Sequence, residues 1–233
     1  MNSPVDIIVI GGGEHAQVVI DAAFSRSDLW QIAGFVDVRP SAFATDSLRV
    51  SYLGDDECSF QWATAKRFVL GIGARPGSVV RQKIVERYDR HAVCWERIIH
   101  AGASVSPSAV LGRGVVILAG AIVNCGAVIG DHCIVNTGAI VEHHVHIGSF
   151  THVGPGAAIG GGTTVGEGSF IGLGSRVRDH VQIGNGVVVG MGAAVLGSIA
   201  DGQIVAGVPA RPLAAKSAAL PHFASAFGRS ARH

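Results

Sequence analysis

The chain has 233 residues, with 18 Lys and Arg against 17 Asp and Glu, so its formal net charge is +1. Nucleic-acid-binding proteins need a surplus of basic residues to neutralise phosphates, and this balance argues against a nucleic-acid partner. Hydrophobic residues make up 48% of the chain, which excludes a disordered protein, and no apolar stretch reaches the roughly 18 residues of a membrane span. The N-terminal residues lack the features of a signal peptide, so we expect a cytoplasmic protein.

The first residues predict the beginning of a nucleotide-binding fold. Residues 7–10 form an apolar run typical of a buried strand, residues 11–13 are a glycine turn, and the apolar spacing of residues 18–23 predicts a helix. The N-terminus of such a helix faces the turn and favours an anionic ligand. Because Ala16 stands where the third glycine of a GxGxxG motif would fall, we favour a mononucleotide or nucleotide-sugar site over NAD.

Two further strands and a second helix complete this domain. Residues 32–36 predict a strand that ends at Asp37, where nucleotide-binding folds often place a carboxylate that binds a hydroxyl group. The alternative is that Asp37 only ends the strand. Residues 68–72 predict a third strand ending at Gly73, and residues 79–88 predict a helix. We therefore expect a Rossmann-like α/β domain over residues 1–100.

The rest of the chain carries a six-residue repeat. From Val105 to Val195, every sixth residue is Val, Ile or Leu at sixteen successive positions, and the hexads run from Ala103 to Ser198 without an inserted loop. Each hexad predicts a short strand with its aliphatic side chain in a narrow core, followed by a turn. One coil cannot bury its own face, so stacked coils must supply the core. We expect this domain to span residues 101–213, followed by a tail at 214–233.

Histidines gather in the middle of the repeat. His143 and His144 fall at a corner turn and His146 points outward from the next strand, so they do not converge within one chain. Zinc needs three or four ligands in one place, and the four cysteines include no CxxC pair, so we predict no metal site. A neutral imidazole accepts a proton near pH 7, which favours general-base catalysis over exposed turn histidines without a role. No GxSxG elbow supports an acyl-enzyme route.

The period resembles that of left-handed parallel β-helix acyltransferases, in which three hexads form one triangular coil. This resemblance, and not the period itself, implies the left-handed sense and the stacking of residues 18 apart. The segment Gly207–Leu213, GVPARPL, resembles the motif that ends many such helices. The Ala-rich tail that follows predicts a short helix.

Nearly the whole chain resembles bacterial N-acetyltransferases that act on nucleotide-activated 4-amino sugars of the bacillosamine and perosamine type, with sialic acid O-acetyltransferases as relatives. The resemblance rests on four segments: Val9–Ala16, Gly34–Asp37, Val135–His143 and Ile147–Gly154. It implies a homotrimer that binds acetyl-CoA between adjacent β-helices and holds the sugar nucleotide on the N-terminal domain.

The resemblance also implies roles for individual residues. His143 is the implied general base, and the residues implied to contact acetyl-CoA are His152, Gly161, Leu173 and Met191. The residues implied to hold the nucleotide are Gly13, Glu14, His15, Asp37, Val38 and Gly73, with Asn136 near the sugar. Two of these have alternative roles, His15 as a cap of the first helix and Asn136 as a turn residue.

The chain departs from the family's pattern in two places. An acidic residue usually follows the catalytic histidine and increases its basicity, whereas this chain has His144, which we expect to act beside His143 as the second catalytic residue. Because a neutral imidazole supplies no negative charge, two alternatives stay open: the base is weaker here, or another carboxylate takes this part. Glu142 is adjacent but points differently along its strand. The segment from Gly73 to Arg81 is longer than the family's compact turn, which leaves the identity of the nucleotide open.

The expected reaction is direct transfer of an acetyl group from acetyl-CoA to the amino group of a nucleotide-linked 4-amino-deoxy sugar. His143 removes the proton in this scheme, and backbone N–H groups stabilise the oxyanion. Two alternatives stay open from the sequence: O-acetylation of a sugar hydroxyl, and a β-helix without catalytic activity that binds a nucleotide sugar as a scaffold or sensor.

Overall fold

The computed structural model describes residues 3–40 and 49–213, so the expected tail helix lies outside the described residues. The N-terminal domain is a parallel sheet with the strand order β2-β1-β3-β4 among these residues. The strands are β1 (Val5–Ile10), β2 (Trp30–Val36), β3 (Arg67–Leu70) and β4 (Cys94–Trp95). The helices are α1 (Glu14–Phe24), α2 (Asp56–Ser59), the 3-10 helix Phe60–Trp62 and α3 (Val80–Asp89). The predicted elements are all present, with ends shifted by about one to four residues.

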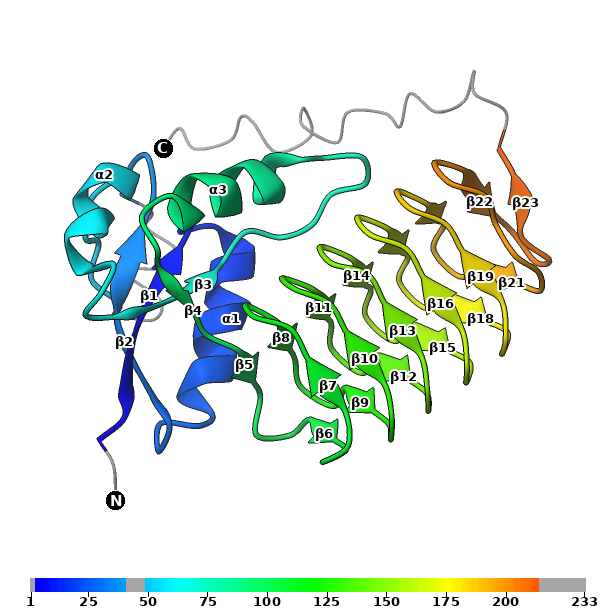
Figure 1. Cartoon of the computed structure of the whole chain (residues 1–233), viewed down its shortest axis with the longest axis horizontal. Coiled ribbons are helices and arrows are strands. Elements are labelled where there is room, and N and C mark those ends of the chain that lie inside the picture. Colours follow the sequence, from blue (N-terminus) through cyan, green and yellow to red (C-terminus); the bar gives the residue numbers. More distant parts are fainter. Residues whose placement is uncertain (1–2, 41–48, 214–233) are drawn as a thin grey trace, which may run out of the picture.

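Both faces of this sheet are covered. The side chains of Ile7 and Val9 pack against α1, and the opposite face packs against Val85 and Tyr88 of α3. Successive strand residues point to opposite faces, so the continuous apolar run of β1 is buried on both sides. Helix α1 also packs against the first coils of the second domain, as Figure 1 shows.

The second domain is a β-helix whose chain passes through three sheets in turn, and their strands are parallel except for the last one, β23 (Figure 1). The strands of the eight-stranded sheet are β5 (Ile98–Ile99), β8 (Val116–Ile117), β11 (Ile134–Val135), β14 (His152–Val153), β17 (Phe170–Ile171), β20 (Val188–Val189), β22 (Ile204–Ala206) and β23 (Arg211–Pro212). The six-stranded sheet contains β6 (Ser104–Val105), β9 (Ile122–Val123), β12 (Ile140–Val141), β15 (Ala158–Ile159), β18 (Arg176–Val177) and β21 (Ala194–Val195). The five-stranded sheet contains β7 (Val110–Leu111), β10 (Val128–Ile129), β13 (His146–Ile147), β16 (Thr164–Val165) and β19 (Gln182–Ile183).

The predicted stacking of residues 18 apart is confirmed. Val141 pairs with Val123 on one side and with Ile159 on the other, and each of these aliphatic side chains is buried in the common core. The fold is the expected β-helix, which begins one hexad earlier than the predicted start at Ala103, because β5 already pairs with β8. The division of the chain at residue 100 stays a prediction.

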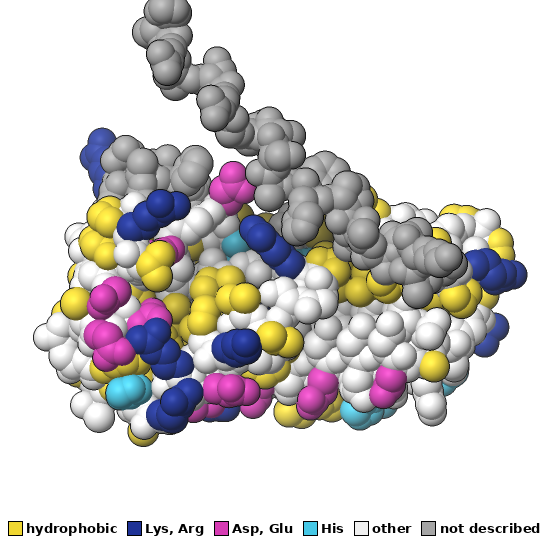
Figure 2. Space-filling model, turned by 90° about the horizontal axis from the view of Figure 1, so that it is seen from above, with side chains coloured by type: hydrophobic (Ala, Val, Ile, Leu, Met, Phe, Trp, Pro, Cys, Tyr) yellow, Lys and Arg dark blue, Asp and Glu magenta, His cyan; other side chains and the backbone are white. Residues whose placement is uncertain are grey.

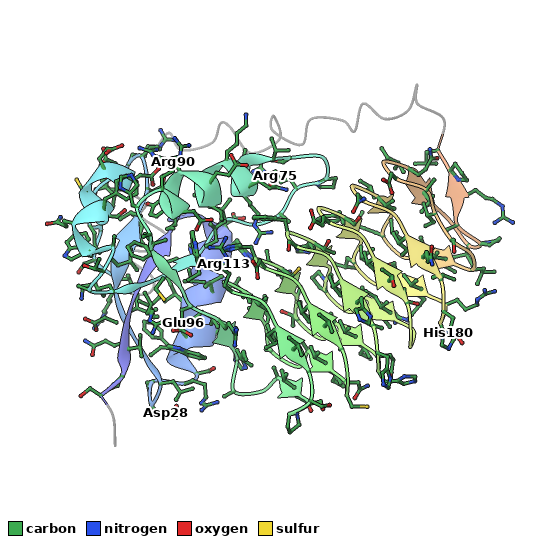
Figure 3. The ribbon with its side chains drawn as sticks, in the orientation of Figure 1. Asp28, Arg75, Arg90, Glu96, Arg113 and His180 are labelled. Carbon is green, nitrogen blue, oxygen red and sulfur yellow. The ribbon has the colours of Figure 1, made fainter. Side chains whose placement is uncertain are left out.

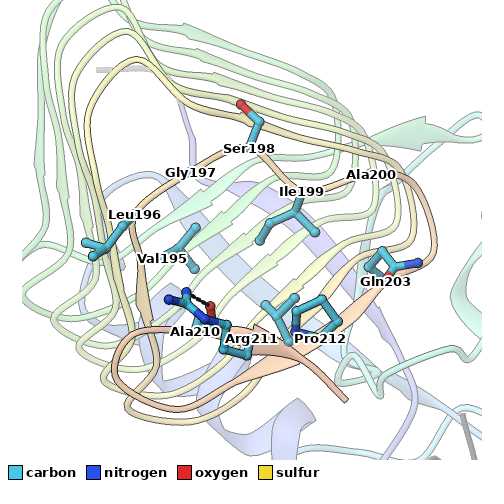
Figure 4. A pocket seen from close by; sticks show the side chains of 11 residues that line it. Val195, Leu196, Gly197, Ser198, Ile199, Ala200, Gln203, Ala210, Arg211 and Pro212 are labelled. Atoms are coloured by element: carbon cyan, nitrogen blue, oxygen red, sulfur yellow. Dashed lines mark hydrogen bonds between the residues drawn. The ribbon is translucent and has the colours of Figure 1, made fainter. Parts of the chain in front are cut away.

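The end of the β-helix departs from the regular spacing. Val189 pairs with Val205, only 16 residues later, and β23 then turns back antiparallel to β22. An open pocket of about 360 Å³ lies at this end, between Leu196 and Arg211 (Figure 4). Figure 4 also shows the triangular coils stacked behind it.

The charged side chains gather mainly over the N-terminal domain in the view of Figure 2.

Candidate functional site

A cavity of about 430 Å³ opens beside the glycine turn of the N-terminal domain. Its lining residues are Gly11, Gly13, Glu14, His15, Asp37, Gly71, Ile72, Gly73, Ala74, Arg75, Ser78 and Val80. Five of the predicted nucleotide-binding residues are therefore brought together here. Val38 is not in the lining, and its side chain is exposed beside Asp37. Asn136 also lies outside the lining, at a corner of the β-helix, where its side chain accepts a hydrogen bond from the backbone N–H of Thr137.

Asp37 fixes the glycine turn against the end of β2. Its Oδ2 accepts a hydrogen bond from the backbone N–H of Gly12 at 2.8 Å, and its Oδ1 accepts one from the backbone N–H of Val38 at 2.7 Å. A carboxylate offers about four acceptor positions, so the two oxygens keep capacity for a further donor. Asp37 therefore does more than end the strand, and it remains able to bind a hydroxyl group.

Two predicted site histidines lie on either side of the interface between the N-terminal domain and the β-helix, which we call the seam. His15 is in the first turn of α1, and burial together with Arg81 lowers its pKa to about 4. His152 is in β14 and stacks on Phe170 with the ring centroids 4.7 Å apart. Burial, then the charges of His15 and Arg81, lower the pKa of His152 to about 3. Both histidines are therefore neutral at pH 7.

Arg81 is a residue of this seam that the sequence did not single out. It is only 4% exposed, and its Nη2 donates a hydrogen bond to the backbone carbonyl of His132 at 2.6 Å. The spacing of Arg81, Val85 and Tyr88 places all three on the buried face of α3. The sequence did contain one indication of a special role for Arg81. It shares the i, i+4, i+7 spacing of the buried residues of its helix, and a charged residue on a buried face needs a specific partner.

His143 lies at a different place, the corner between β12 and β13, which we call the histidine corner (residues 142–145). Its Nδ1 is 3.2 Å from the Nδ1 of His144, and the roles of donor and acceptor depend on the tautomers. Glu142 accepts hydrogen bonds from the side chain of Asn124 and the backbone N–H of His143, so it orders the turn without contacting the His143 ring. His146 is exposed on the next strand, as the sequence predicts.

Glycines in the next coil make room for this corner. A Cβ atom added to Gly161 would be 2.6 Å from Cε1 and Nε2 of His143. The imidazole therefore occupies the space that a side chain at position 161 would fill. His144 has a φ of 56° in the position that Gly126 and Gly162 fill in the neighbouring coils. Every sixth residue from Gly114 to Gly192 has a positive φ, so this left-handed conformation belongs to the turn of each hexad, and His144 takes it in place of the more usual glycine.

The remaining predicted acetyl-CoA residues lie at a third place. Leu173 and Met191 are exposed and stacked one coil apart, at the corner that leads from the eight-stranded to the six-stranded sheet. A single chain thus brings His143 together with Gly161, and Leu173 together with Met191. It does not bring either pair to the cavity beside Asp37.

The described residues contain no group of three or more His, Cys, Asp or Glu side chains placed to hold a metal ion. All four cysteines are free, and only Cys133 among them is buried. Within residues 3–40 and 49–213, no helix has both the length and the apolar character needed to cross a membrane.

Comparisons with known proteins agree with this architecture. Residues 6–88 match the PglD N-terminal domain family. A perosamine N-acetyltransferase from Caulobacter crescentus, solved as a histidine variant with CoA and GDP-perosamine, is 35% identical over 90% of this chain and 97% of that chain (TM-score 0.82). The acetyltransferase domain of PglB from Neisseria gonorrhoeae FA1090, solved with acetyl coenzyme A, is 33% identical over 90% of this chain and all of that chain, 100% (TM-score 0.82). The chain belongs to the family of nucleotide-sugar amino N-acetyltransferases.

This membership confirms the expected family, its left-handed β-helix and the class of enzyme, a sugar N-acetyltransferase. WeeI from Acinetobacter baumannii AYE is 23% identical over 90% of this chain and 100% of that chain (TM-score 0.76), and it supports the fold alone. The sequence has no match among the curated proteins.

Proposed function

We propose that this N-acetyltransferase transfers the acetyl group of acetyl-CoA to the amine of a nucleotide-linked 4-amino sugar, with His143 as the general base. The observation that carries the proposal is the geometry of the histidine corner. One ring nitrogen of His143 is 3.2 Å from His144, while the other lies over Gly161, where no side chain covers it. The relatives solved with CoA, acetyl-CoA and GDP-perosamine support the same donor and the same class of acceptor.

The chemistry needs one particular tautomer of His143. If its Nδ1–H donates to Nδ1 of His144, the lone pair of Nε2 is free to accept a proton. The sugar amine attacks the thioester carbonyl carbon, and Nε2 takes the proton that the nitrogen loses. The C–S bond then breaks as the tetrahedral intermediate collapses, and the CoA thiolate takes the proton from Nε2, so CoA leaves as its thiol and His143 is neutral again. Backbone N–H groups near the acetyl group stabilise the oxyanion.

We further propose that the N-terminal domain, residues 1–100, holds the nucleotide through Gly13, Glu14, His15, Asp37, Val38 and Gly73. Asn136 then lies near the sugar, and His152, Gly161, Leu173 and Met191 contact acetyl-CoA. Support comes from the cavity that collects five of the six nucleotide-binding residues. Within one chain the nucleotide cavity, the histidine corner and the corner with Leu173 and Met191 lie at separate places. Because one reaction needs all three together, this separation supports a homotrimer in which each active site combines residues of adjacent subunits.

The reaction is tested by incubating the chain with acetyl-CoA and UDP-, dTDP- and GDP-linked 4-amino sugars and measuring the products by mass spectrometry. We expect one acceptor to gain an acetyl group that survives mild alkali. We expect His143→Ala to lower turnover about 10²-fold or more without changing the fold. An alkali-labile ester would instead indicate a hydroxyl acceptor, and near-normal turnover in His143→Ala would exclude this residue as the base.

The shared active site is tested by mixing two inactive variants. His143→Ala removes the base, and Asp37→Ala removes the carboxylate of the nucleotide cavity. If residues of adjacent subunits form each site, hybrid trimers from co-expressed chains contain some intact sites and recover part of the activity. Sites contained within single chains would give no recovery, and a monomer by light scattering would contradict the trimer directly.

A further inference from the structure

The segment between β3 and α3 lies at the junction of two cavities. Three of its residues, Ala74, Arg75 and Ser78, line the nucleotide cavity beside Asp37. The same three residues line a second cavity of about 20 Å³ at the seam between the domains, whose other wall includes Phe170 of the β-helix. His152 stacks on Phe170, so the segment stands between the nucleotide cavity and the β-helix face that carries His152.

The backbone of this segment is held by a turn. Ser78 N–H donates to the carbonyl of Arg75 at 3.1 Å, and the two central residues are Pro76 and Gly77. Gly77 has a φ of 71°, and a proline followed by a glycine with positive φ is the pattern of a type II turn. Arg75 is therefore presented by a preorganised turn (Figure 1 shows the segment extending over the β-helix).

Arg75 supplies the positive charge of the nucleotide cavity. Among the lining residues, Glu14 and Asp37 are acidic, and Arg75 is the only lysine or arginine. Within the described part of the chain, Arg75 makes no ion pair. The backbone N–H groups of the first turn of α1 receive no side-chain cap from Gly13. These amides and one guanidinium together form a site for an anion in a cavity whose other charges are negative.

We infer that Arg75 binds the diphosphate of the nucleotide-linked substrate, with the nucleoside toward Asp37 and the sugar toward His152. This inference rests on the proposed function and deepens it. A diphosphate joins the nucleoside to the sugar, so a substrate whose nucleoside lies beside Asp37 and whose sugar leaves the cavity toward the β-helix places its phosphates at the segment that carries Arg75. The planar guanidinium donates two parallel hydrogen bonds to phosphate oxygens, which a lysine ammonium cannot reproduce.

The test compares Arg75→Met with Arg90→Met. Arg90 is also exposed, but it lies at the opposite end of α3 from Arg75 (Figure 3), and methionine keeps much of the aliphatic length in both variants. Binding of UDP, dTDP and GDP, and of uridine, thymidine and guanosine, is measured by calorimetry for both variants and the native chain. We expect Arg75→Met to weaken the preferred diphosphate about tenfold or more while leaving its nucleoside within about twofold. Arg90→Met is expected to bind like the native chain, and Arg75→Lys to fall between.

The outcomes separate the inference from the proposed function. Native-like affinity of Arg75→Met for the diphosphate would overturn the role of Arg75 and leave nucleotide binding intact. An equal loss for diphosphate and nucleoside would also overturn it, because the residue would then only maintain the cavity. If the native chain bound none of the three diphosphates, the nucleotide-sugar acceptor of the proposed function would fail as well.

Discussion

The imidazole of His143 lies directly against the backbone of Gly161, one coil further along the β-helix. A Cβ atom at position 161 would be 2.6 Å from both Cε1 and Nε2 of the ring. Non-bonded atoms of this kind prefer separations of about 3.5–4.0 Å, so any side chain at position 161 must displace the imidazole. The position of the proposed base therefore depends on a glycine 18 residues away in the sequence.

Gly161→Ala is expected to reduce kcat about 10²-fold while the fold is retained, because a displacement of the base by about 1 Å is enough for a loss of this size. Gly197→Ala is the matched control, since Gly197 lies on a corner between the same faces and a Cβ atom there meets no atom within 4 Å. The effect is measured again in the His143→Ala background, where we expect no additional loss. A similar loss in that background would show that Gly161 acts on acetyl-CoA and not through His143.

His144→Glu is expected to keep or raise kcat. The carboxylate replaces an imidazole that lies 3.2 Å from Nδ1 of His143, and a negative charge there favours the protonated form of the base. His144→Gln is the neutral control, and we expect it to be the slower of the two variants. The measurement is the initial rate at saturating acetyl-CoA and sugar nucleotide. A large loss of activity in His144→Glu would show that the imidazole of His144 has a catalytic task of its own.

Much of the fold was predictable because it depends on periodicity. A spacing of six residues places Val123, Val141 and Ile159 at equivalent positions of successive coils, and the resemblance supplied the three hexads in each coil. The corner position of His143 follows from the same count. The shortened last coil was not predictable, because the 16-residue spacing between Val189 and Val205 begins only where the regular hexads end.

The seam between the domains was harder to predict than either domain. The packing of α1 against Ile98, Val116 and Leu118 of the β-helix sets where His15 lies relative to the second domain, and no local pattern in the sequence fixes this packing. Arg81 was visible as a charged residue on the apolar face of a helix, but its partner, the carbonyl of His132, is 51 residues away. Within the β-helix the repeat determines which residues are neighbours. Across the interface between the domains, only the tertiary structure determines them.

Ile159→Ala is expected to lower the free energy of unfolding by about 2–5 kcal/mol. Ile159 is fully buried and is stacked between Val141 and Val177, and the hydrogen-bonded coils above and below limit how far the core can collapse into the space. Val110→Ala is the control, because Val110 is 60% exposed and its loss should cost less than about 1 kcal/mol. Urea unfolding followed by circular dichroism measures both. Equal effects of the two substitutions would contradict a core built from the inward hexad positions.

Stability is expected to fall as the pH falls below about 6.5, and His152 contributes to this loss. Its pKa is about 3 in the folded chain, where burial, His15 and Arg81 disfavour the charged form, against about 6.5 for a histidine exposed to water. Between these two values the unfolded chain binds a proton that the folded chain does not. The stability present above pH 6.5 is therefore lost progressively toward pH 3, at up to about 1.4 kcal/mol per pH unit for this histidine.

His152→Phe tests this assignment, because phenylalanine retains the stacking on Phe170 and cannot take up a proton. The free energy of unfolding is measured in urea at pH 7, 6, 5 and 4 for the native chain and the variant. We expect the variant to lose about 1 kcal/mol less per pH unit below pH 6, since one proton uptake on unfolding has been removed. His15 and His132 are also held neutral by burial, so part of the slope remains in the variant. Identical slopes in the two proteins would mean that His152 is protonated as readily in the folded chain as in the unfolded one.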